Sequence, residues 1–259
     1  MPTPQVSFIG AGPGDPELLT IKAQRLIREA DLLLYAGSLV PRQILTWAKE
    51  EADIRDSSGM TLEQTHTALV QAAERGHKAV RVHTGDPSLY GAILEQMRLL
   101  QQDGITFEVV PGITAAFAAA AKAAVSFTVP EQTQTLIFTR MSGRTPVPEQ
   151  ERLRDLAAHK CSLAIYLSAS LVRDMVMELR AGGLPGSTPV CIATSIGWPA
   201  ENLTWTDLKH LECEVQRTGL TRQAVFLVLP GQEAGQAAQS RLYSPDFSHG
   251  FRSTPGDEK

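Results

Sequence analysis

Val6-Ser7-Phe8-Ile9-Gly10-Ala11-Gly12-Pro13-Gly14-Asp15 is the stretch that decides the fold, because a run typical of a buried strand is followed directly by a glycine-rich turn. A dinucleotide-binding turn has a third glycine three positions after the second, where the next helix receives a pyrophosphate. That position is Asp15 here. Its carboxylate suits the free N–H groups at a helix start but repels a diphosphate. The stretch therefore predicts a strand, a turn and a helix start. Alone, it is explained equally well by a nucleotide site of an unusual kind and by a purely structural turn.

Two further turns follow apolar runs of the same kind. The run 79–83 leads into Thr84-Gly85-Asp86-Pro87-Ser88-Leu89-Tyr90-Gly91, and the run 107–110 leads into Pro111-Gly112-Ile113-Thr114-Ala115-Ala116. Strand and helix patterns alternate through Val110, which predicts right-handed crossovers and a parallel sheet. The turns then fall at the carboxyl ends of strands, where an open parallel sheet offers a ligand crevice.

Taken together and in this order, the turns at 10–16, 85–87 and 111–114 resemble those of the tetrapyrrole methylases. In that family they gather at one cleft, where S-adenosylmethionine binds in a folded conformation. The resemblance implies an α/β fold of two domains: an N-terminal parallel sheet with flanking helices and a C-terminal mixed sheet with flanking helices.

Four segments are similar to one branch of the family, and the match covers nearly the whole chain. They are Tyr35–Val40, His83–Ser88, Gly143–Glu149 and Ser240–Arg252. Relatives that act earlier on the pathway carry Asp-Arg-Leu-Val after the tyrosine, whereas this chain has Ala36-Gly37-Ser38. The resemblance implies an S-adenosylmethionine-dependent C-methyltransferase that methylates precorrin-4 or cobalt-precorrin-4 at ring carbon C11 in cobalamin biosynthesis.

The 259 residues can form one large domain or two modest ones, and the change of pattern after the alanine-rich stretch 115–124 favours two. We expect domains at 1–114 and 115–231, a hinge near 111–116 and a tail at 232–259. The tail composition predicts a loose segment, while the resemblance of its middle implies partial ordering. In the second half, adjacent extended runs predict antiparallel pairing. These runs are Thr135–Thr139, Leu163–Leu167, Val190–Thr194, Leu203–Leu208 and Val225–Leu229.

Composition argues against several classes of protein. A net charge of −4 and a pI near 5.9 give no sign of a nucleic-acid surface. Three cysteines without close pairing argue against a disulfide framework or structural zinc, and Cys161 and Cys191 are expected in the core. The six histidines lack metal-ligand spacing. No signal peptide or membrane-spanning run is present, so a cytoplasmic enzyme is predicted.

Residues of the cofactor site follow from the resemblance, which places S-adenosylmethionine, with S-adenosylhomocysteine as product, between the domains. The expected contacts are Pro13, Thr84, Gly85, Asp86, Leu89, Thr114, Ala115, Tyr166, Leu167 and Ala224. Each residue also has an alternative, purely structural explanation. For example, Gly85 could be required only by the conformation of its turn, and Asp86 could be only a helix cap. Two positions depart from the family pattern. Relatives usually have a small residue just before Trp-Pro, whereas the run here is Ser195-Ile196-Gly197-Trp198-Pro199, and they commonly have threonine where this chain has Gln223.

The chemistry of methyl transfer requires that the methyl group be held in line between sulfur and the ring carbon, which is a matter of positioning. No covalent intermediate is needed, and the sequence singles out no catalytic base. The substrate carries carboxylates, so Arg42, Arg140 and Arg144 are candidate partners; the alternative is surface ion pairs. His83 ends a strand and either faces substrate or hydrogen-bonds a local turn.

Other functions stay open at this point. One alternative is an NAD(P)-dependent oxidoreductase of Rossmann type, which the first turn alone suggests and Asp15 disfavours. A second is a tetrapyrrole methylase that acts at a different ring carbon, and a third is a non-catalytic tetrapyrrole carrier. Cobalt in the substrate is undecided, and the homodimer is implied only by the resemblance.

Overall fold

The structure is a computed structural model that describes residues 3–232, 240, 244, 246–248 and 250–252. The chain divides into two compact units. One comprises Met1–Ala119 together with Ser195–Asn202, and the other comprises Ala120–Thr194 together with Leu203–Lys259. The short segment 195–202 therefore belongs to the first unit, although it lies far along the chain.

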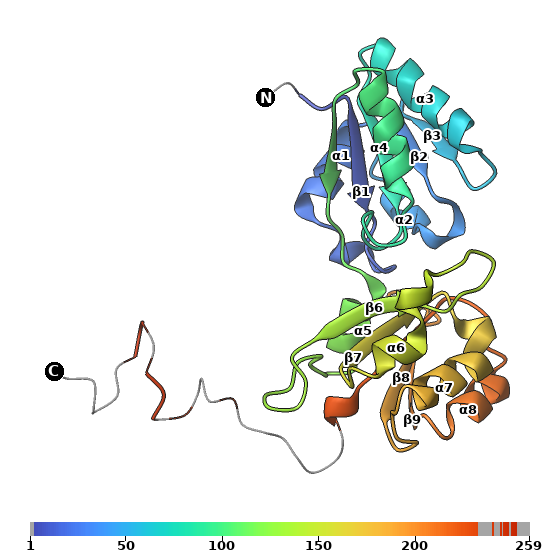
Figure 1. The fold of residues 1–259 in the computed structure, drawn as a ribbon. Coiled ribbons are helices and arrows are strands. Elements are labelled where there is room, and N and C mark those ends of the chain that lie inside the picture. Colours follow the sequence, from blue (N-terminus) through green and yellow to red (C-terminus); the bar gives the residue numbers. More distant parts are fainter. Residues whose placement is uncertain (1–2, 233–239, 241–243, 245, 249, 253–259) are drawn as a thin grey trace. The chain divides into compact units, whose positions relative to one another are not determined.

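The first unit is built on a five-stranded sheet with the order β3-β2-β4-β1-β5, and the strand pairs are parallel (Figure 1). The strands are β1 (Val6–Gly10), β2 (Leu32–Tyr35), β3 (Asp53–Asp56), β4 (Ala79–His83) and β5 (Phe107–Val110). The helices are α1 (Ile21–Glu29), α2 (Arg42–Leu45), α3 (Leu62–Glu74) and α4 (Ile93–Gln102), and within α5 (Ala115–Lys122) the chain passes to the second unit. The predicted parallel sheet is confirmed.

Side-chain alternation along the strands gives this sheet two apolar faces. On one face, Phe8 and Leu34 pack with buried residues of α3 and α4. On the other, Ile9 and Leu33 pack with residues of α1 and α2, including Ile27. Helices thus cover both faces, and this leaves the two ends of the strands as the places where polar groups can gather.

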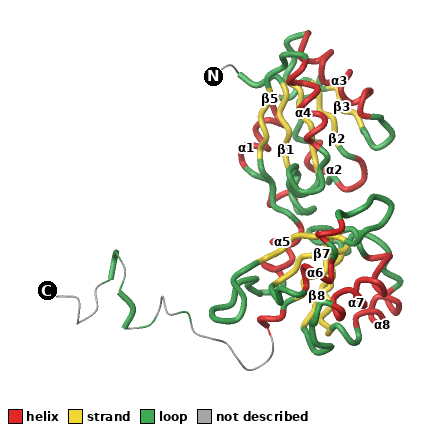
Figure 2. The backbone as a smooth tube through the Cα atoms, viewed as in Figure 1, coloured by secondary structure: helices red, strands yellow, loops and turns green. Residues whose placement is uncertain are grey.

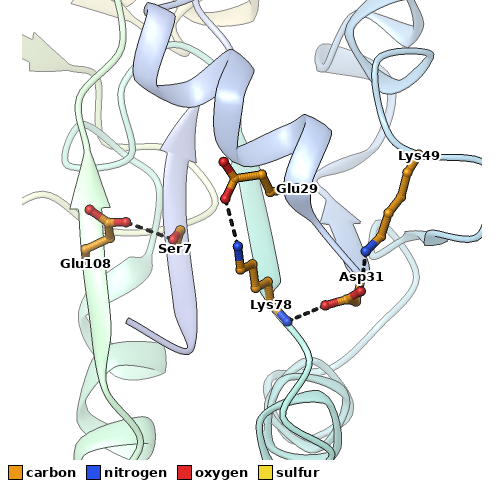
Figure 3. A network of polar contacts seen from close by, with 6 residues as sticks. All are labelled: Ser7, Glu29, Asp31, Lys49, Lys78 and Glu108. Carbon is orange, nitrogen blue, oxygen red and sulfur yellow. Dashed lines mark hydrogen bonds and ion pairs between the residues drawn. The ribbon is translucent and has the colours of Figure 1, made fainter. Parts of the chain in front are cut away.

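The amino ends of the strands carry charges that are paired with one another (Figure 3). The Lys78 ammonium lies 2.8 Å from a Glu29 carboxylate oxygen, and the Lys78 backbone N–H donates to Asp31 at 2.7 Å. Asp31 also forms an ion pair with Lys49. These contacts neutralise the charges at this end of the sheet.

The second unit is built on a five-stranded mixed sheet with the order β6-β7-β10-β8-β9. Its strands are yellow in Figure 2, where β7 and β8 are labelled. Strand β10 is antiparallel to both of its neighbours, whereas β6 is parallel to β7. The strands are β6 (Leu136–Arg140), β7 (Ser162–Tyr166), β8 (Pro189–Thr194), β9 (Asn202–Asp207) and β10 (Ala224–Val228). Each end of the five predicted strands is within one residue of the observed end. The mixed sheet is confirmed.

Three helices cover one face of the second sheet: α6 (Leu153–Ala157), α7 (Val172–Ala181) and α8 (Leu211–Thr218). Ile165, Ile192 and Phe226 from the strands pack there with Met175 of α7 and Leu211 of α8. All five side chains are buried, so this cluster is the core of the unit.

Cys161 and Cys191 are buried and free, as predicted, and burial raises the pKa of the Cys191 thiol to about 11. Within the described part of the chain, no helix is long and apolar enough to cross a membrane. Much of the predicted tail, 233–239, 241–243, 245, 249 and 253–259, lies outside the described residues, as does part of the motif 240–252.

Candidate functional site

The three glycine-rich turns meet at the carboxyl edge of the first sheet. Gly12 and Gly85 exchange two backbone hydrogen bonds of 3.2 and 2.8 Å, so the first and second turns are joined directly. A Cβ atom on Gly10 would lie 2.6 Å from Gly112 Cα, and one on Gly112 would overlap the Gly85 carbonyl oxygen. Glycine is therefore required sterically at positions 10 and 112, because only a residue without a Cβ lets the three turns approach so closely.

Asp86 braces two of these turns. One carboxylate oxygen accepts the Ser88 N–H at 2.8 Å, and the other accepts the Gly112 N–H at 2.9 Å. Both oxygens already have backbone donors, and so this side chain fixes the second turn against the third. Thr84 beside it is exposed, whereas Thr114 is buried.

The first turn is supported by segment 195–202. The Trp198 indole N–H donates to the Pro13 carbonyl at 3.1 Å, and a Cβ on Gly14 would collide with the same indole. Asp15 accepts the Glu17 N–H at 2.9 Å and thereby caps a short 3-10 helix, which precedes α1. Ile196 is buried, so its side chain forms part of the packing rather than of an exposed surface.

Two potentially cationic side chains lie buried near this edge, on the same face of β4. Arg81 donates to Ser57 Oγ at 2.7 Å and to the Leu34 carbonyl and Gln96 Oε1 at 3.3 Å each. Burial lowers the pKa of Arg81 to about 10, which leaves it charged at neutral pH. A buried guanidinium is thus held by neutral acceptors.

His83 follows on that face, one residue before the second turn, and is 5% exposed. Its ring lies 6.1 Å from the ring of Phe8, and its Nε2 atom is buried without a hydrogen-bond partner among the described residues. Burial, and then the charge of Arg81, lower the pKa of His83 to about 3, which makes the imidazole neutral. The site has a buried neutral nitrogen that lacks a partner.

The site residues expected from the second unit are close together at one edge of its sheet. Tyr166 ends β7 and Leu167 follows it, while Ala224 begins the adjacent strand β10. Leu167 and Gln223 both have positive φ angles, 53° and 57°, which non-glycine residues seldom adopt. Such backbone strain is concentrated at functional sites in proteins.

The three candidate arginines have different surroundings. Arg42 is exposed at the start of α2; the pKa of Asp56 is lowered mainly by hydrogen bonds from Ser58 and to a smaller extent by the charge of Arg42. Arg140 ends β6, and its guanidinium donates to the carbonyls of Met141, Thr145 and Pro146. Arg144 is exposed in the loop that follows β6. It takes part in no hydrogen bond or ion pair within the described residues.

A surface hollow of about 440 Å³ lies elsewhere, at the amino ends of β2 and β3. Asp31 pairs there with Lys49 and Asp53 with Arg55, whereas Glu51, Arg75 and His77 of its lining are in no ion pair among the described residues. Among the described residues, no cluster of histidine, cysteine, aspartate and glutamate could hold a metal ion. The turns at the carboxyl edge are the better candidate site.

Comparison with known proteins decides the family. The sequence profile of the Tetrapyrrole (Corrin/Porphyrin) Methylases matches residues 5–212. The chain belongs to this family. This methylase is therefore an enzyme of methyl transfer, which favours that reaction over the NAD(P)-dependent alternative.

Two curated relatives of the methylase align along almost its whole length. Cobalt-precorrin-4 C(11)-methyltransferase of Priestia megaterium is 44% identical, over 95% of this chain and 96% of the relative. Precorrin-4 C(11)-methyltransferase of Pseudomonas aeruginosa is 43% identical, over 97% of this chain and 99% of the relative.

Solved structures confirm the fold of the methylase. A cobalt precorrin-4 methyltransferase superposes with a TM-score of 0.84 at 44% identity, covering 86% of this chain and 94% of that one. A uroporphyrin-III C-methyltransferase from Thermus thermophilus, complexed with S-adenosylhomocysteine, gives a TM-score of 0.71 at 26% identity, covering 86% and 96%.

Sequence reasoning missed Trp198 as a support of the first turn and Arg81 as a buried charge. An arginine within the apolar run 79–83 was a usable signal for Arg81, because a charged residue inside a central strand is rarely solvent-exposed. Trp198 gave no such signal, since its partner Pro13 is 185 positions away.

Proposed function

We propose that this methylase transfers the methyl group of S-adenosylmethionine to ring carbon C11 of precorrin-4 or cobalt-precorrin-4. The observation that carries the proposal is the alignment with C(11)-methyltransferases along almost the whole chain, at 43 and 44% identity. The close approach of the three glycine-rich turns supports it. In the reaction the sulfur–methyl bond would break with its electron pair kept by sulfur, the ring carbon would supply the pair for the new carbon–methyl bond, and the positive charge would leave as a proton from the tetrapyrrole.

The residues present fit such a cofactor. Gly10 and Gly112 let the backbones of the three turns meet closely, because a Cβ at either position would clash with its neighbours, and His83 Nε2 is a buried atom without a partner among the described residues. When bound, the cofactor supplies an electrophilic methyl group on a positively charged sulfonium. A neutral His83 adds no positive charge that would repel it.

We propose that the cofactor contacts are those the resemblance implies, and geometry refines their roles. Asp86 acts by fixing its own turn against that of Gly112, since both of its oxygens already accept backbone N–H groups. The strained positions 167 and 223 support a binding role for Tyr166, Leu167 and Ala224. The other contacts are Pro13, Thr84, Gly85, Leu89, Thr114 and Ala115.

For the substrate carboxylates we propose Arg144 and Arg42, whose side chains are exposed. An arginine guanidinium binds a carboxylate through two parallel hydrogen bonds, which gives orientation as well as attraction. Orientation is what methyl transfer needs, because the ring carbon must meet the methyl group in line with sulfur.

The test is incubation with methyl-labelled S-adenosylmethionine and either precorrin-4 or cobalt-precorrin-4, followed by NMR of the product. Label at C11 supports the proposal, and the better of the two substrates identifies the pathway variant. Label at another ring carbon would keep methyl transfer and discard the assigned position. Tetrapyrrole binding without turnover would favour the carrier alternative.

We further propose a homodimer. Ile21 is 88% exposed, and it adjoins Lys22, which pairs with Glu108 of the edge strand β5. Val109 of that strand is also exposed. Sedimentation of the full chain should give twice the monomer mass, whereas a monomer at assay concentration would refute the proposal. The cytoplasmic location stays a prediction.

A further inference from the structure

The loop 141–147, which follows β6, is held from within by two side chains: Ser142 Oγ accepts the Val147 N–H at 3.3 Å, and Arg140 makes the larger number of bonds. One terminal nitrogen of Arg140 donates to the carbonyls of Met141 at 3.2 Å and Thr145 at 3.0 Å. The other donates to the Pro146 carbonyl at 2.9 Å. The guanidinium therefore bridges the start and the end of the loop, and these bonds occupy it at the position where a substrate carboxylate was expected.

The start of the loop is anchored separately. The Met141 N–H donates to Ser168 Oγ at 2.8 Å, and Ser168 Oγ donates to the Tyr166 carbonyl at 2.6 Å. Ser168 is 0% exposed, so this hydroxyl is a buried and satisfied link. It ties the loop to the end of β7, which carries the proposed cofactor contacts.

Arg144 lies at the exposed part of this loop. The Gly143 N–H donates to the Thr145 carbonyl at 3.3 Å, so the backbone turns tightly around Arg144. The Thr145 carbonyl accepts both from Gly143 and from Arg140, which couples the turn to the clamp. Arg152 and Arg154 of the same unit are paired with glutamates, whereas Arg144, like Arg173 and Arg222, has no partner within the described residues.

We propose that Arg140 is a positioning residue: it clamps loop 141–147 so that the guanidinium of Arg144 is presented to a substrate carboxylate. The inference rests on the proposed function, because it assumes a substrate with carboxylates. It separates two arginines that the sequence alone placed in the same role.

The chemistry of the two positions predicts different responses to lysine. The clamp needs a planar fork that reaches separated carbonyls, and a lysine ammonium does not reproduce that geometry. At the exposed position, a lysine keeps the positive charge that attracts a carboxylate but loses the second parallel hydrogen bond. Arg140→Lys should therefore behave like Arg140→Gln, while Arg144→Lys should have a KM for the tetrapyrrole between those of the wild type and Arg144→Gln.

Hydrogen exchange of the full chain without ligand tests the clamp. In Arg140→Gln and Arg140→Lys, the Gly143 amide should exchange about tenfold faster, because its acceptor is no longer fixed. The Met141 amide, which Ser168 holds, should be unchanged and acts as an internal control. In Arg144→Gln, both amides should exchange as in the wild type. Unchanged exchange at Gly143 in the Arg140 variants would overturn the clamp.

Steady-state methyl transfer tests the consequence. Both Arg140 variants and Arg144→Gln should raise KM for the tetrapyrrole about tenfold, with kcat and S-adenosylhomocysteine affinity nearly unchanged. Arg154→Lys, which alters a fork to Glu178 on α7, is the matched control and should change neither KM nor exchange. Wild-type kinetics in Arg140→Lys, or a raised KM without faster exchange, would refute the positioning role. Failure of the proposed function would show separately, as no label at C11 with the unmodified protein.

Discussion

Replacing His83 by glutamine should remove a specific loss of stability on acidification. The side chain is buried at the carboxyl end of β4, beneath the second turn, and its imidazole is neutral in the folded protein. Glutamine is neutral at every pH and of similar length. The substitution therefore removes the proton-linked contribution while it keeps a polar group at this position.

The size of the effect follows from the pKa of His83, which is about 3 in the folded protein against an ordinary value of 6.5. Between these two values the unfolded chain binds a proton that the folded protein does not, so stability falls as the pH drops below 6.5. Each pH unit is worth 1.36 kcal/mol, and the wild-type protein should therefore lose about 2 kcal/mol between pH 7 and pH 5 through this group.

Urea unfolding of both proteins at pH 7 and pH 5 measures this contribution. Other titrating groups, including Asp56 near Arg81, are common to the two proteins and cancel in the difference. The variant should lose about 2 kcal/mol less than the wild type over this interval. Equal losses would refute the reasoning, as would an imidazole that titrates near its ordinary pKa by NMR.

Two other substitutions test the turns. Gly112→Ala should destabilise the protein by about 1–3 kcal/mol and weaken S-adenosylhomocysteine binding, because the new Cβ overlaps the Gly85 carbonyl. Calorimetry measures both the stability and the affinity. An unchanged affinity would show that this turn is not part of the site. Gly59→Ala is its control, since nothing lies within 4 Å of the added carbon, and should leave affinity unchanged. Trp198→Phe removes the hydrogen bond to the Pro13 carbonyl and should lower unfolding free energy by about 1 kcal/mol in urea; no change would show that packing alone supports the first turn.

The convergence of the turns could be predicted from sequence because it depends on local rules. Each turn follows an apolar run, and parallel strands bring their carboxyl ends to one edge. The register pairs Gly10 with His83 and Ile9 with Val110, which is the alignment that this rule requires. Five strand positions in the second half were likewise readable from their apolar runs.

The roles of individual side chains were less predictable, because they depend on partners distant in sequence or on backbone atoms. Arg140 was predicted from its charge to bind substrate, yet it donates to loop carbonyls. Because every residue has a backbone carbonyl, the sequence does not show which of them accepts a hydrogen bond. Asp86 was predicted as a cofactor contact or a cap, and its bond to the Gly112 N–H, 26 positions away, is a further role that the sequence did not indicate. A charged residue in a motif therefore indicates where a site is before it indicates what the residue does there.

The hydrogen bond between Trp198 and Pro13 joins residues 185 positions apart within the first unit. During translation, Pro13 is synthesised early, whereas Trp198 is synthesised only after strands β6, β7 and β8 of the second sheet. A nascent chain released at residue 119 therefore has all five strands of the first sheet but lacks the indole that supports its first turn. The first turn therefore gains this hydrogen bond late in synthesis, and a fragment that ends at residue 119 folds without it.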